Sequence, residues 1–304
     1  MGVELFKRIA SLSDKTLKKT LRKTLEKAGY EPVEADDYLY AVGDIPVCLV
    51  AHLDTVFNNP PKHFFFDQEQ EIMWSPDGLG ADDRAGVYAI LQVIQSGRRP
   101  HILFTMDEEK GGIGALMLAT KSNPFPDVNY FIELDRRGGN DCVFYNCENI
   151  AFRAFVEEFG FKTAKGIFSD ISIICPAWDI AGVNLSVGYY NEHSYIEYLN
   201  MRELHNTIER VNKMLDKNNN VKFNFGKNFE GLDILCNRCG IPMNTFIATP
   251  VYDGDVVYEY CPDCLTKHAS FCETCGGFYP TDTKLVHDKD TCPECYKESL
   301  NSGR

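Results

Sequence analysis

The sequence lacks the apolar run that a membrane-spanning helix needs, since none of its apolar stretches approaches the roughly 20 residues that cross a bilayer. Its first 30 residues are too rich in charge, and lack the apolar centre, for a signal peptide. Basic residues are outnumbered, with 31 Lys and Arg against 44 Asp and Glu, and the net charge is −13. This charge argues against general binding to nucleic acid or to an anionic membrane. We therefore expect a cytoplasmic protein.

Cysteine is abundant by contrast, with twelve residues in a chain of 304. Without an export signal, so many cysteines indicate reduced thiols or metal ligands rather than a disulfide framework. Four of them lie in apolar, strand-like contexts, where we expect buried small hydrophobic side chains. These four are Cys48, Cys142, Cys147 and Cys175. The other eight form four CxxC pairs near the C-terminus.

The composition divides the chain into four segments. In residues 1–29, leucines recur at mostly helical spacing, which predicts a helical segment with a solvated, lysine-rich face. Residues 30–215 alternate apolar strands with helices, which predicts an α/β domain of three layers with a central, mostly parallel mixed sheet. The polar, Asn-rich stretch 216–232 predicts a linker. Residues 233–304 hold the CxxC pairs and predict a small zinc-binding module.

Acidic residues and histidines follow the predicted strands of the α/β domain. His52 and Asp54 follow VCLVA, Glu108 and Glu109 follow HILFTM, Asp135 follows YFIEL, and His193 comes shortly after NLSVGYY. Ligands of α/β sheets bind at the carboxyl ends of the strands, so we expect these side chains to meet at one edge. Asp82 opens a helix in GLGADDRAG, and by itself it would be interpreted as a helix N-cap.

Carboxylates gathered at one edge repel one another, so the predicted cluster requires a compensating cation. Two histidines and three carboxylates are suitable ligands for a pair of zinc ions, with cobalt or manganese as alternatives. These ligands are His52, Asp82, Glu109, Asp135 and His193. A water that bridges such a pair supplies hydroxide near neutral pH. Of the two adjacent glutamates, one can face a metal ion while its neighbour takes the proton of that water.

Five ordered motifs resemble those of the co-catalytic dinuclear zinc exopeptidases, which include aminopeptidases and tripeptidase-like enzymes. The motifs are AHLDTV, GLGADDRAG, MDEEKGGIGA, ELD and NEHS, and the resemblance covers roughly residues 30–212. It implies the zinc-peptidase fold and assigns the ligands to two ions. One ion is held by His52, Asp82 and Asp135, the other by Asp82, Glu109 and His193, so that Asp82 bridges both.

The same resemblance implies the remaining catalytic roles. Glu108 matches the general base that takes a proton from the bridging water, and Asp54 matches the carboxylate that orients His52. The peptide bond after Asp82 is expected to be cis. Larger relatives insert a dimerisation or lid domain between the positions of Asp135 and His193, but here only 57 residues separate the two. We therefore expect no such domain at this point of the chain.

The eight remaining cysteines have the spacing of structural zinc sites. CNRC pairs with CPDC, and CETC pairs with CPEC, across spacers of 21 and 16 residues. Four thiolates close the coordination sphere of a zinc ion, so both sites are predicted to be structural. The similar spacers favour two sequential quartets over a cross-braced arrangement or an iron–sulfur cluster. The predicted ligands are Cys236, Cys239, Cys261 and Cys264 in one site, and Cys272, Cys275, Cys292 and Cys295 in the other.

Substrate contacts have weaker sequence signals. Arg136 and Arg137 follow a predicted ligand and could bind a substrate carboxylate, although surface ion pairs are equally compatible with them. Tyr189, Tyr190 or the backbone of residues 168–170 could stabilise the oxyanion, with core packing of the tyrosines as the simpler interpretation.

The predicted function is a zinc-dependent metallopeptidase that hydrolyses a terminal peptide bond of short peptides by means of a metal-bridging hydroxide. The alternatives are an amidohydrolase that deacylates small N-acyl compounds, because the metal chemistry is identical, and a catalytically silent adaptor that binds proteins through its zinc module. An acidic C-terminal module argues against DNA binding. It leaves protein contact, homo-oligomerisation or covering of the substrate as roles for this module.

Overall fold

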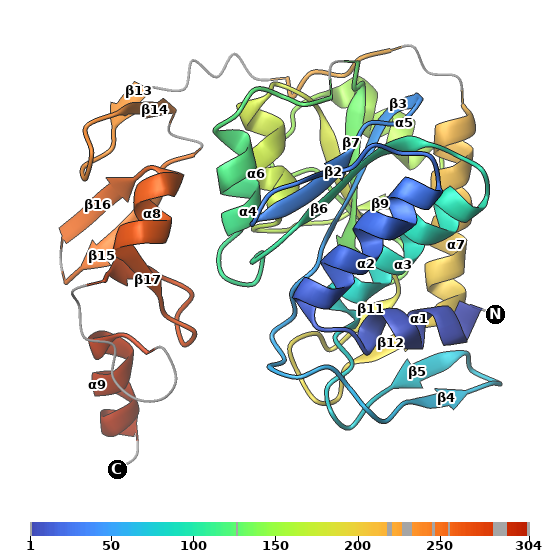
Figure 1. Ribbon diagram of the computed structural model, residues 1–304, viewed down its shortest axis with the longest axis horizontal. Helices are drawn as coiled ribbons and strands as arrows, with labels where there is room; N and C mark the ends of the chain where they lie inside the picture. Colours follow the sequence, from blue (N-terminus) through green and yellow to red (C-terminus); the bar gives the residue numbers. More distant parts are fainter. Residues whose placement is uncertain are drawn as a thin grey trace.

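The protein has an α/β architecture of three layers, with a mixed central sheet between helices, as the sequence predicts (Figure 1). The structure is a computed structural model that describes residues 2–125, 127–217, 221–226, 233–244, 247–254, 256–281 and 291–302. Among these residues, no helix combines the length and the apolar composition that crossing a bilayer demands.

The central sheet contains eight strands in the order β1-β2-β6-β3-β7-β10-β8-β9. Their bounds are β1 Val33–Glu34, β2 Tyr38–Ala41, β3 Ile45–His52, β6 Pro100–Thr105, β7 Tyr130–Arg136, β8 Asp141–Val143, β9 Lys162–Thr163 and β10 Gly182–Ser186. The four middle strands, β6, β3, β7 and β10, are mutually parallel, so their carboxyl ends lie at one edge. They are also apolar and almost fully buried, as strands covered on both faces must be.

Helices cover both faces of this sheet. Helices α3 (Ala81–Gln95) and α7 (Met201–Asp216) pack together on one face, and α4 (Ile113–Ala119) and α6 (Asp170–Ala177) pack together on the other. The stretch VYAILQVIQSG predicts a helix that corresponds to α3, and the helical periodicity of LNMRELHNTIERVNKML predicts α7. The sequence does not predict α4 and α6, because both are short and almost wholly apolar and therefore show no polar face. A further helix, α5 (Ile150–Glu157), begins at Asn149, whose side chain accepts a hydrogen bond from the backbone N–H of Phe152.

Two helices precede the sheet, α1 (Gly2–Ala10) and α2 (Asp14–Lys27), and the leucine spacing of α2 buries Leu17, Leu21 and Leu25. The predicted solvated, lysine-rich face does not include Lys18, which is only 6% exposed. Its ammonium group donates hydrogen bonds to the carbonyl oxygens of Ala35 and Asp36. These bonds compensate the buried charge and fasten the helix to the chain that leads into β2.

The stretch GVNLSVGYY was predicted to be a single strand, and the structure divides it into two. Strand β10 belongs to the central sheet, whereas β11 (Tyr189–Tyr190) belongs to a second, four-stranded sheet with the order β11-β12-β5-β4. The division occurs at Gly188, whose φ is +86° and where a Cβ would lie 2.6 Å from the carbonyl oxygen of Asn200. The other strands of this sheet are β4 Phe65–Asp67, β5 Ile72–Trp74 and β12 Tyr198–Asn200.

Part of the predicted linker packs against the α/β layer. Phe223 and Phe225 are buried, and the backbone of Phe223 bonds to Asn129 and Ala181. Residues 218–220 and 227–232 of this stretch lie outside the described residues, so the four segment boundaries stay predictions.

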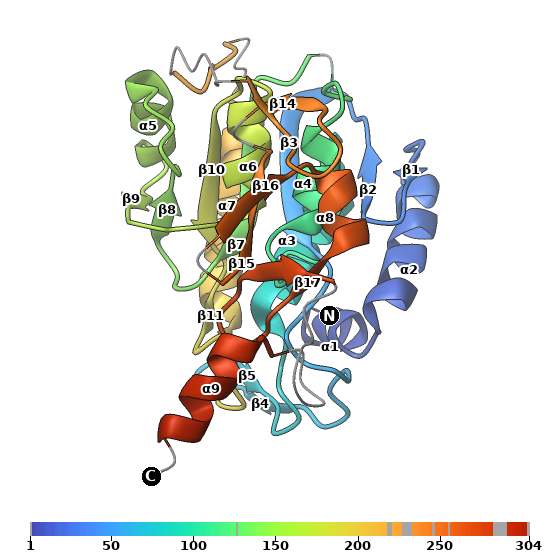
Figure 2. The same ribbon diagram turned by 90° about the vertical axis from the view of Figure 1, so that its left-hand side faces the viewer.

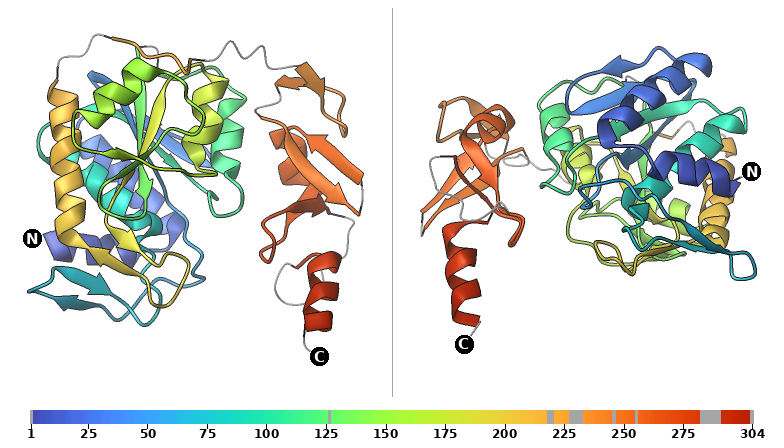
Figure 3. Two further views of the ribbon diagram at one scale, coloured as in Figure 1. Left: turned by 180° about the vertical axis from the view of Figure 1, so that it is seen from behind. Right: turned by 60° about the horizontal axis from the view of Figure 1, so that its bottom comes forward.

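The described residues of the cysteine-rich module form two small sheets and two helices. Its elements are β13 Asp233–Leu235, β14 Pro242–Asn244, β15 Thr249–Asp253, β16 Val256–Tyr260, α8 Pro262–His268, β17 Ala269–Phe271, β18 Phe278–Pro280 and α9 Pro293–Ser302. Helix α8 packs on α4, and apolar residues of the module continue the core of the α/β layer. Figures 2 and 3 show the module on the side of the sheet that carries α4 and α6.

Candidate active site

The acidic residues and histidines singled out in the sequence meet at one edge of the central sheet. His52 ends β3, Asp135 lies one residue before the end of β7, and Glu108 and Glu109 follow β6. His193 follows β11, in a left-handed conformation with a φ of 61°. Strands β3, β6 and β7 therefore end at this site, because parallel strands have their carboxyl ends at one edge of the sheet. The chain that leaves the fourth parallel strand, β10, returns to the site through β11.

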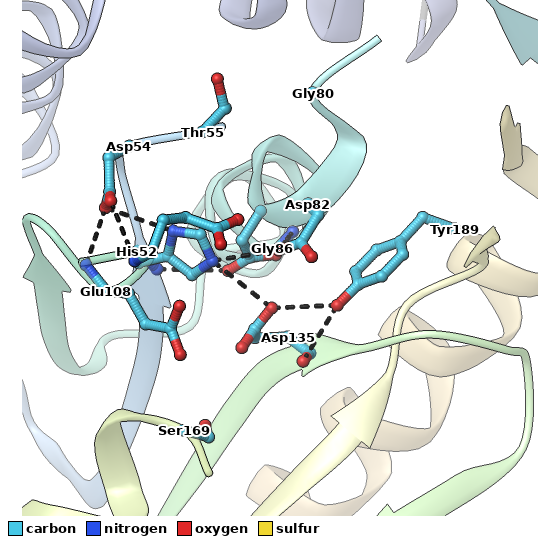
Figure 4. A network of polar contacts seen from close by, with 12 residues as sticks. His52, Asp54, Thr55, Gly80, Asp82, Gly86, Glu108, Asp135, Ser169 and Tyr189 are labelled. Atoms are coloured by element: carbon cyan, nitrogen blue, oxygen red, sulfur yellow. Dashed lines mark hydrogen bonds and ion pairs between the residues drawn. The ribbon is translucent and has the colours of Figure 1, made fainter. Parts of the chain in front are cut away.

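The first group of candidate ligands surrounds His52. Its Nε2 atom lies 3.0 Å from Asp82 Oδ1 and 3.6 Å from Asp135 Oδ1. One ligand atom from each of these three residues lies within 4.8 Å of the other two, which is the spacing of donors around a single metal ion. Figure 4 shows the side chains of Asp82 and Asp135 on the same side of the His52 ring, and both contact its Nε2 atom.

The second group shares Asp82 with the first. His193 Nε2 lies 3.2 Å from Asp82 Oδ2 and 3.0 Å from Glu109 Oε1. The two oxygens of the Asp82 carboxylate thus face different groups, Oδ1 toward His52 and Oδ2 toward His193. Asp82 is therefore the residue that the two groups of candidate ligands have in common.

Asp82 does not cap helix α3, because the N-cap position is Gly80. The φ and ψ angles of Asp82 are −80° and 103°, outside the helical region, and its side chain points away from the helix toward the edge of the sheet. Capping was therefore the wrong interpretation of this residue. The Asp82–Asp83 peptide bond is cis, as the resemblance implies.

Two buried carboxylates that the sequence analysis missed hold this segment in place. Glu197 accepts hydrogen bonds from the backbone N–H of Gly80 at 2.7 Å and of Asp82 at 3.0 Å. Asp83 accepts from the backbone N–H of His52 at 3.2 Å and of Gly86 at 2.9 Å. No spacing in the sequence distinguishes Glu197, which comes 115 residues after Asp82. Asp83 lies within the GLGADDRAG motif, directly after Asp82, and that position is the one signal available.

Asp54 lies on the opposite side of the His52 ring from Asp82 (Figure 4). Its Oδ1 atom is 3.4 Å from His52 Nδ1, and its two oxygens accept hydrogen bonds from the backbone N–H groups of Glu108 and Glu109, each at 3.1 Å. One carboxylate therefore lies beside the imidazole and also fixes the turn that presents both glutamates. Orientation of a histidine ligand by such a carboxylate is common in metal sites.

Negative charge is concentrated around these residues. Six acidic residues of the described chain are buried, and all of them belong to this site or its immediate surroundings. They are Asp54, Asp82, Asp83, Glu133, Asp170 and Glu197. Burial raises the pKa of Glu108 well above its ordinary range, and the charges of Asp135 and Asp170 raise it further, against the pull of His52. Burial and the charge of Asp82 raise the pKa of Asp135 to about 7.

The donor set fits a pair of divalent cations. Glu109 Oε1 is buried and has no hydrogen-bond partner among the described residues, although His193 Nε2 lies 3.0 Å away, so the two atoms converge without a proton aligned between them. Imidazole nitrogens and carboxylate oxygens are ligands that zinc accepts in catalytic sites. Cations at the two groups would stabilise the ionised carboxylates that burial and mutual repulsion otherwise disfavour.

Similarity to known proteins is found at the level of structure. No family model matches the chain, and no curated protein matches it in sequence. The aminopeptidase PepT from Bacillus cereus aligns with a TM-score of 0.59 and 16% identity, over 70% of this chain and 97% of that one. A tripeptidase from Staphylococcus aureus gives 0.56 and 15%, over 70% and 96%. The Pyrococcus horikoshii TET1 peptidase gives 0.52 and 14%, over 71% and 99%.

The chain has an aminopeptidase fold. At these identities the similarity shows the architecture alone and confirms the predicted fold class. The roles of individual residues at the edge of the sheet stay predictions. They depend on the geometry described above.

The eight C-terminal cysteines form two sequential groups of four. The thiols of Cys236, Cys239, Cys261 and Cys264 lie within 4.8 Å of one another, as do those of Cys272, Cys275, Cys292 and Cys295. The sulfurs of Cys239 and Cys261 are 3.7 Å apart. This agrees with the roughly 3.8 Å between sulfurs of a tetrahedral zinc site with Zn–S of about 2.3 Å. The cross-braced alternative would bring different pairs together.

Backbone groups favour the thiolate form of one cysteine in each quartet. Burial acts to raise the pKa of Cys236, but hydrogen bonds from backbone N–H groups, first that of Cys261, lower it to about 6. Cys272 has the same arrangement with the N–H of Cys292, and its pKa is also lowered to about 6. Thiolates are the form that binds zinc, so the donor chemistry fits this metal. The other four cysteines are buried, as the sequence predicts.

The residues proposed for substrate contact differ in their surroundings. Arg137 is exposed and pairs with Glu192 at 2.9 Å, whereas Arg136 forms no ion pair among the described residues, and its Nε atom is buried without a hydrogen-bond partner. The hydroxyl of Tyr189 donates to Asp135, and that of Tyr190 donates to Glu203. Both tyrosine hydroxyls are thus engaged within the protein, which does not favour an oxyanion role for either.

Proposed function

We propose that the protein is a zinc-dependent metallopeptidase that removes a terminal residue from short peptides. One observation carries this proposal: a single carboxylate, Asp82, is shared by two groups of imidazole and carboxylate donors. Beside them lies Glu108, with a carboxylate oxygen within 4.8 Å of ligand atoms of His52 and Glu109. The aminopeptidase fold supports the class of enzyme.

Two divalent ions bound to these groups would polarise the substrate carbonyl and lower the pKa of a water molecule between them. His52, Asp82 and Asp135 would hold one ion, and Asp82, Glu109 and His193 the other. Glu108 takes the proton of the attacking water and delivers it to the leaving amine.

Hydrolysis assays with aminoacyl-anilides, short peptides and N-acyl amino acids, each with and without a chelator, test the proposal. Release of terminal residues that the chelator abolishes is the expected result. Cleavage of N-acyl compounds alone would indicate the amidohydrolase. If the fully metal-loaded protein hydrolysed none of these compounds, the result would indicate the adaptor and contradict the proposal.

We also propose that the chain is divided into the four segments that the sequence predicts. Each cysteine quartet would bind a structural zinc ion. Homo-oligomerisation is a further role proposed for the module. The similar Pyrococcus horikoshii peptidase can assemble into a tetrahedron or a large octahedral shell, which supports testing the mass of this protein in solution.

Replacement of Asp54 by asparagine should weaken metal binding. An amide cannot accept hydrogen bonds at both of its ends, so either the orientation of His52 or one of the two backbone contacts to Glu108 and Glu109 is lost. We expect the affinity for the catalytic ions to fall about 10–100-fold, measured by calorimetric titration of the metal-free protein.

Asp77→Asn is a matched control for this variant. Asp77 also accepts from two backbone N–H groups, of Lys62 and His63, and lies 3.0 Å from the ring nitrogen of His63. All three contacts involve its Oδ2 atom, so the amide oxygen of asparagine can keep them, and the residue is on the surface and outside the site. Metal affinity should be unchanged there. An equal loss in both variants would mean that Asp54 acts on folding and not on the ligands.

Replacement of Arg136 by alanine should weaken the binding of peptides that have a free carboxylate. Its Nε atom has no protein acceptor among the described residues, and a substrate carboxylate would satisfy it. We expect KM for free dipeptides to rise about tenfold to a hundredfold, with a much smaller change for amidated dipeptides. Arg137→Ala, which removes a charge already paired with Glu192, is the comparison. Equal effects on free and amidated peptides would contradict this role.

A further inference from the structure

The cavity beside the candidate active site is lined by two parts of the chain that are distant in sequence. It has a volume of about 1060 Å³ and reaches the side chains of Asp82, Glu108 and Asp135. The cysteine-rich module supplies residues on the same cavity, among them Tyr252 and Phe271. A cavity of this size matches those that enclose small ligands.

Specific contacts hold the module against the turn that carries the glutamates. A Cβ on Gly111, two residues after Glu109, would lie 2.8 Å from the ring of Phe278 in the module. Phe278 in turn packs against Phe271, with ring centroids 5.2 Å apart. Helix α8 packs on α4, the helix that follows this turn (Figure 2). The module is therefore placed by the same backbone segment that places the proposed general base.

No inserted domain covers the cavity from the α/β domain itself. Between Asp135 and His193, the described residues form helices α5 and α6, strands β8 to β11 and their connections. The module is thus the part of the described chain that can close the outer side of the cavity.

The walls of this cavity expose apolar side chains. From the α/β domain, Ile167 is fully exposed and Phe168 is 43% exposed; from the module, Tyr252 is 38% exposed. Exposed apolar side chains that line a cavity from two sides are typical of a pocket for an apolar ligand group.

The second cysteine quartet fixes the shape of the module wall. Cys275, Gly276 and Gly277 line the cavity, and the Sγ atom of Cys275 is 3.6 Å from the hydroxyl of Tyr279, another lining residue. Tyr279 and Tyr252 lie with ring centroids 6.4 Å apart. The turn that would bind the structural ion is therefore part of the wall and directly supports its aromatic side chains.

We infer that the C-terminal cysteine-rich module is the outer wall of the substrate cleft, and that it selects short peptides with a bulky apolar side chain next to the scissile bond. This inference rests on the proposed peptidase function. It gives the module a role in substrate selection, in addition to the structural role that a zinc site of four cysteines has by itself.

The test compares the kcat/KM of leucyl- and alanyl-anilides in the full-length, metal-loaded protein. Tyr252→Ala and Ile167→Ala should each lower the preference for leucine over alanine about tenfold, because both remove apolar surface from the pocket. The control is Val256→Ala, on the strand paired with that of Tyr252, because Val256 is 50% exposed but does not line the cavity. The preference of Val256→Ala for leucine over alanine should equal that of the unmodified chain. Calorimetric binding of a leucyl dipeptide to the Glu108→Gln background of each variant gives a second readout.

The outcomes separate this inference from the proposed function. A preference that is unchanged in Tyr252→Ala, in an active enzyme, would overturn the role of the module and leave the peptidase intact. An equal fall in kcat/KM for the leucyl and alanyl substrates would also overturn the role of the module and leave the peptidase intact. No cleavage and no peptide binding by the unmodified chain would overturn both.

Discussion

Replacement of Glu108 by glutamine should reduce kcat about a thousandfold without loss of metal. The side chain of Glu108 lies beside the donor groups but is not among the close contacts of Asp82, and its turn is held by the backbone contacts to Asp54. Glutamine keeps the shape and the backbone hydrogen bond but cannot accept a proton at neutral pH. Loss of a positioned general base costs about 10²–10⁴-fold in rate. The measurement pairs steady-state kinetics with metal analysis of the purified protein.

The neighbouring residue provides the matched comparison. Glu109→Gln changes the same functional group one position along the chain, in the same turn, but removes the negative charge of a carboxylate that has an oxygen 3.0 Å from His193 Nε2. We expect this variant to lose metal as well as activity, and excess zinc to restore part of the activity. No metal should rescue Glu108→Gln. If Glu108→Gln lost an ion and Glu109→Gln did not, the roles assigned to the two glutamates would be reversed.

These adjacent glutamates also show why part of the site can be predicted from sequence. The apolar strands β3, β6 and β7 can be recognised from their composition. His52 is the last residue of β3, Asp135 lies one residue before the end of β7, and Glu108 follows shortly after β6. Because parallel strands end at a common edge, the sequence is sufficient to bring His52, Glu108 and Asp135 together. The shared position of Asp82 depends on the resemblance, since its local sequence indicates a helix cap.

Other features depend on tertiary contacts that leave no local signal. Glu197 reaches the backbone of Gly80 and Asp82 from a distant loop, and an isolated glutamate in a loop is ordinarily a solvated residue. Helices α4 and α6 cannot be predicted from hydrophobic periodicity, because both are almost wholly apolar. The position of the module cannot be predicted from the sequence either, because the CxxC spacing specifies a metal site but not the surface against which the module packs.

Replacement of Asp82 by asparagine should remove both catalytic ions at once. The two carboxylate oxygens of Asp82 face different groups, at 3.0 Å from His52 and 3.2 Å from His193, so the neutral amide weakens both sites together. Asp135→Asn is the comparison, because Asp135 belongs to the His52 group alone. With both cysteine quartets filled, we expect the metal content to fall from four ions per chain to two in Asp82→Asn, and to three in Asp135→Asn.

Activity should fall about a thousandfold or more in Asp82→Asn, since the ions supply several kcal/mol of transition-state stabilisation. The loss of ions should also show in stability. Without cations, the buried carboxylates of this site face one another uncompensated, so chelation should lower the Tm of the unmodified protein much more than that of Asp82→Asn, where one negative charge is already absent. Metal analysis after dialysis, combined with thermal unfolding, measures both effects. A variant that keeps four ions would mean that Asp82 is not shared between two sites, and the dinuclear assignment would then be wrong.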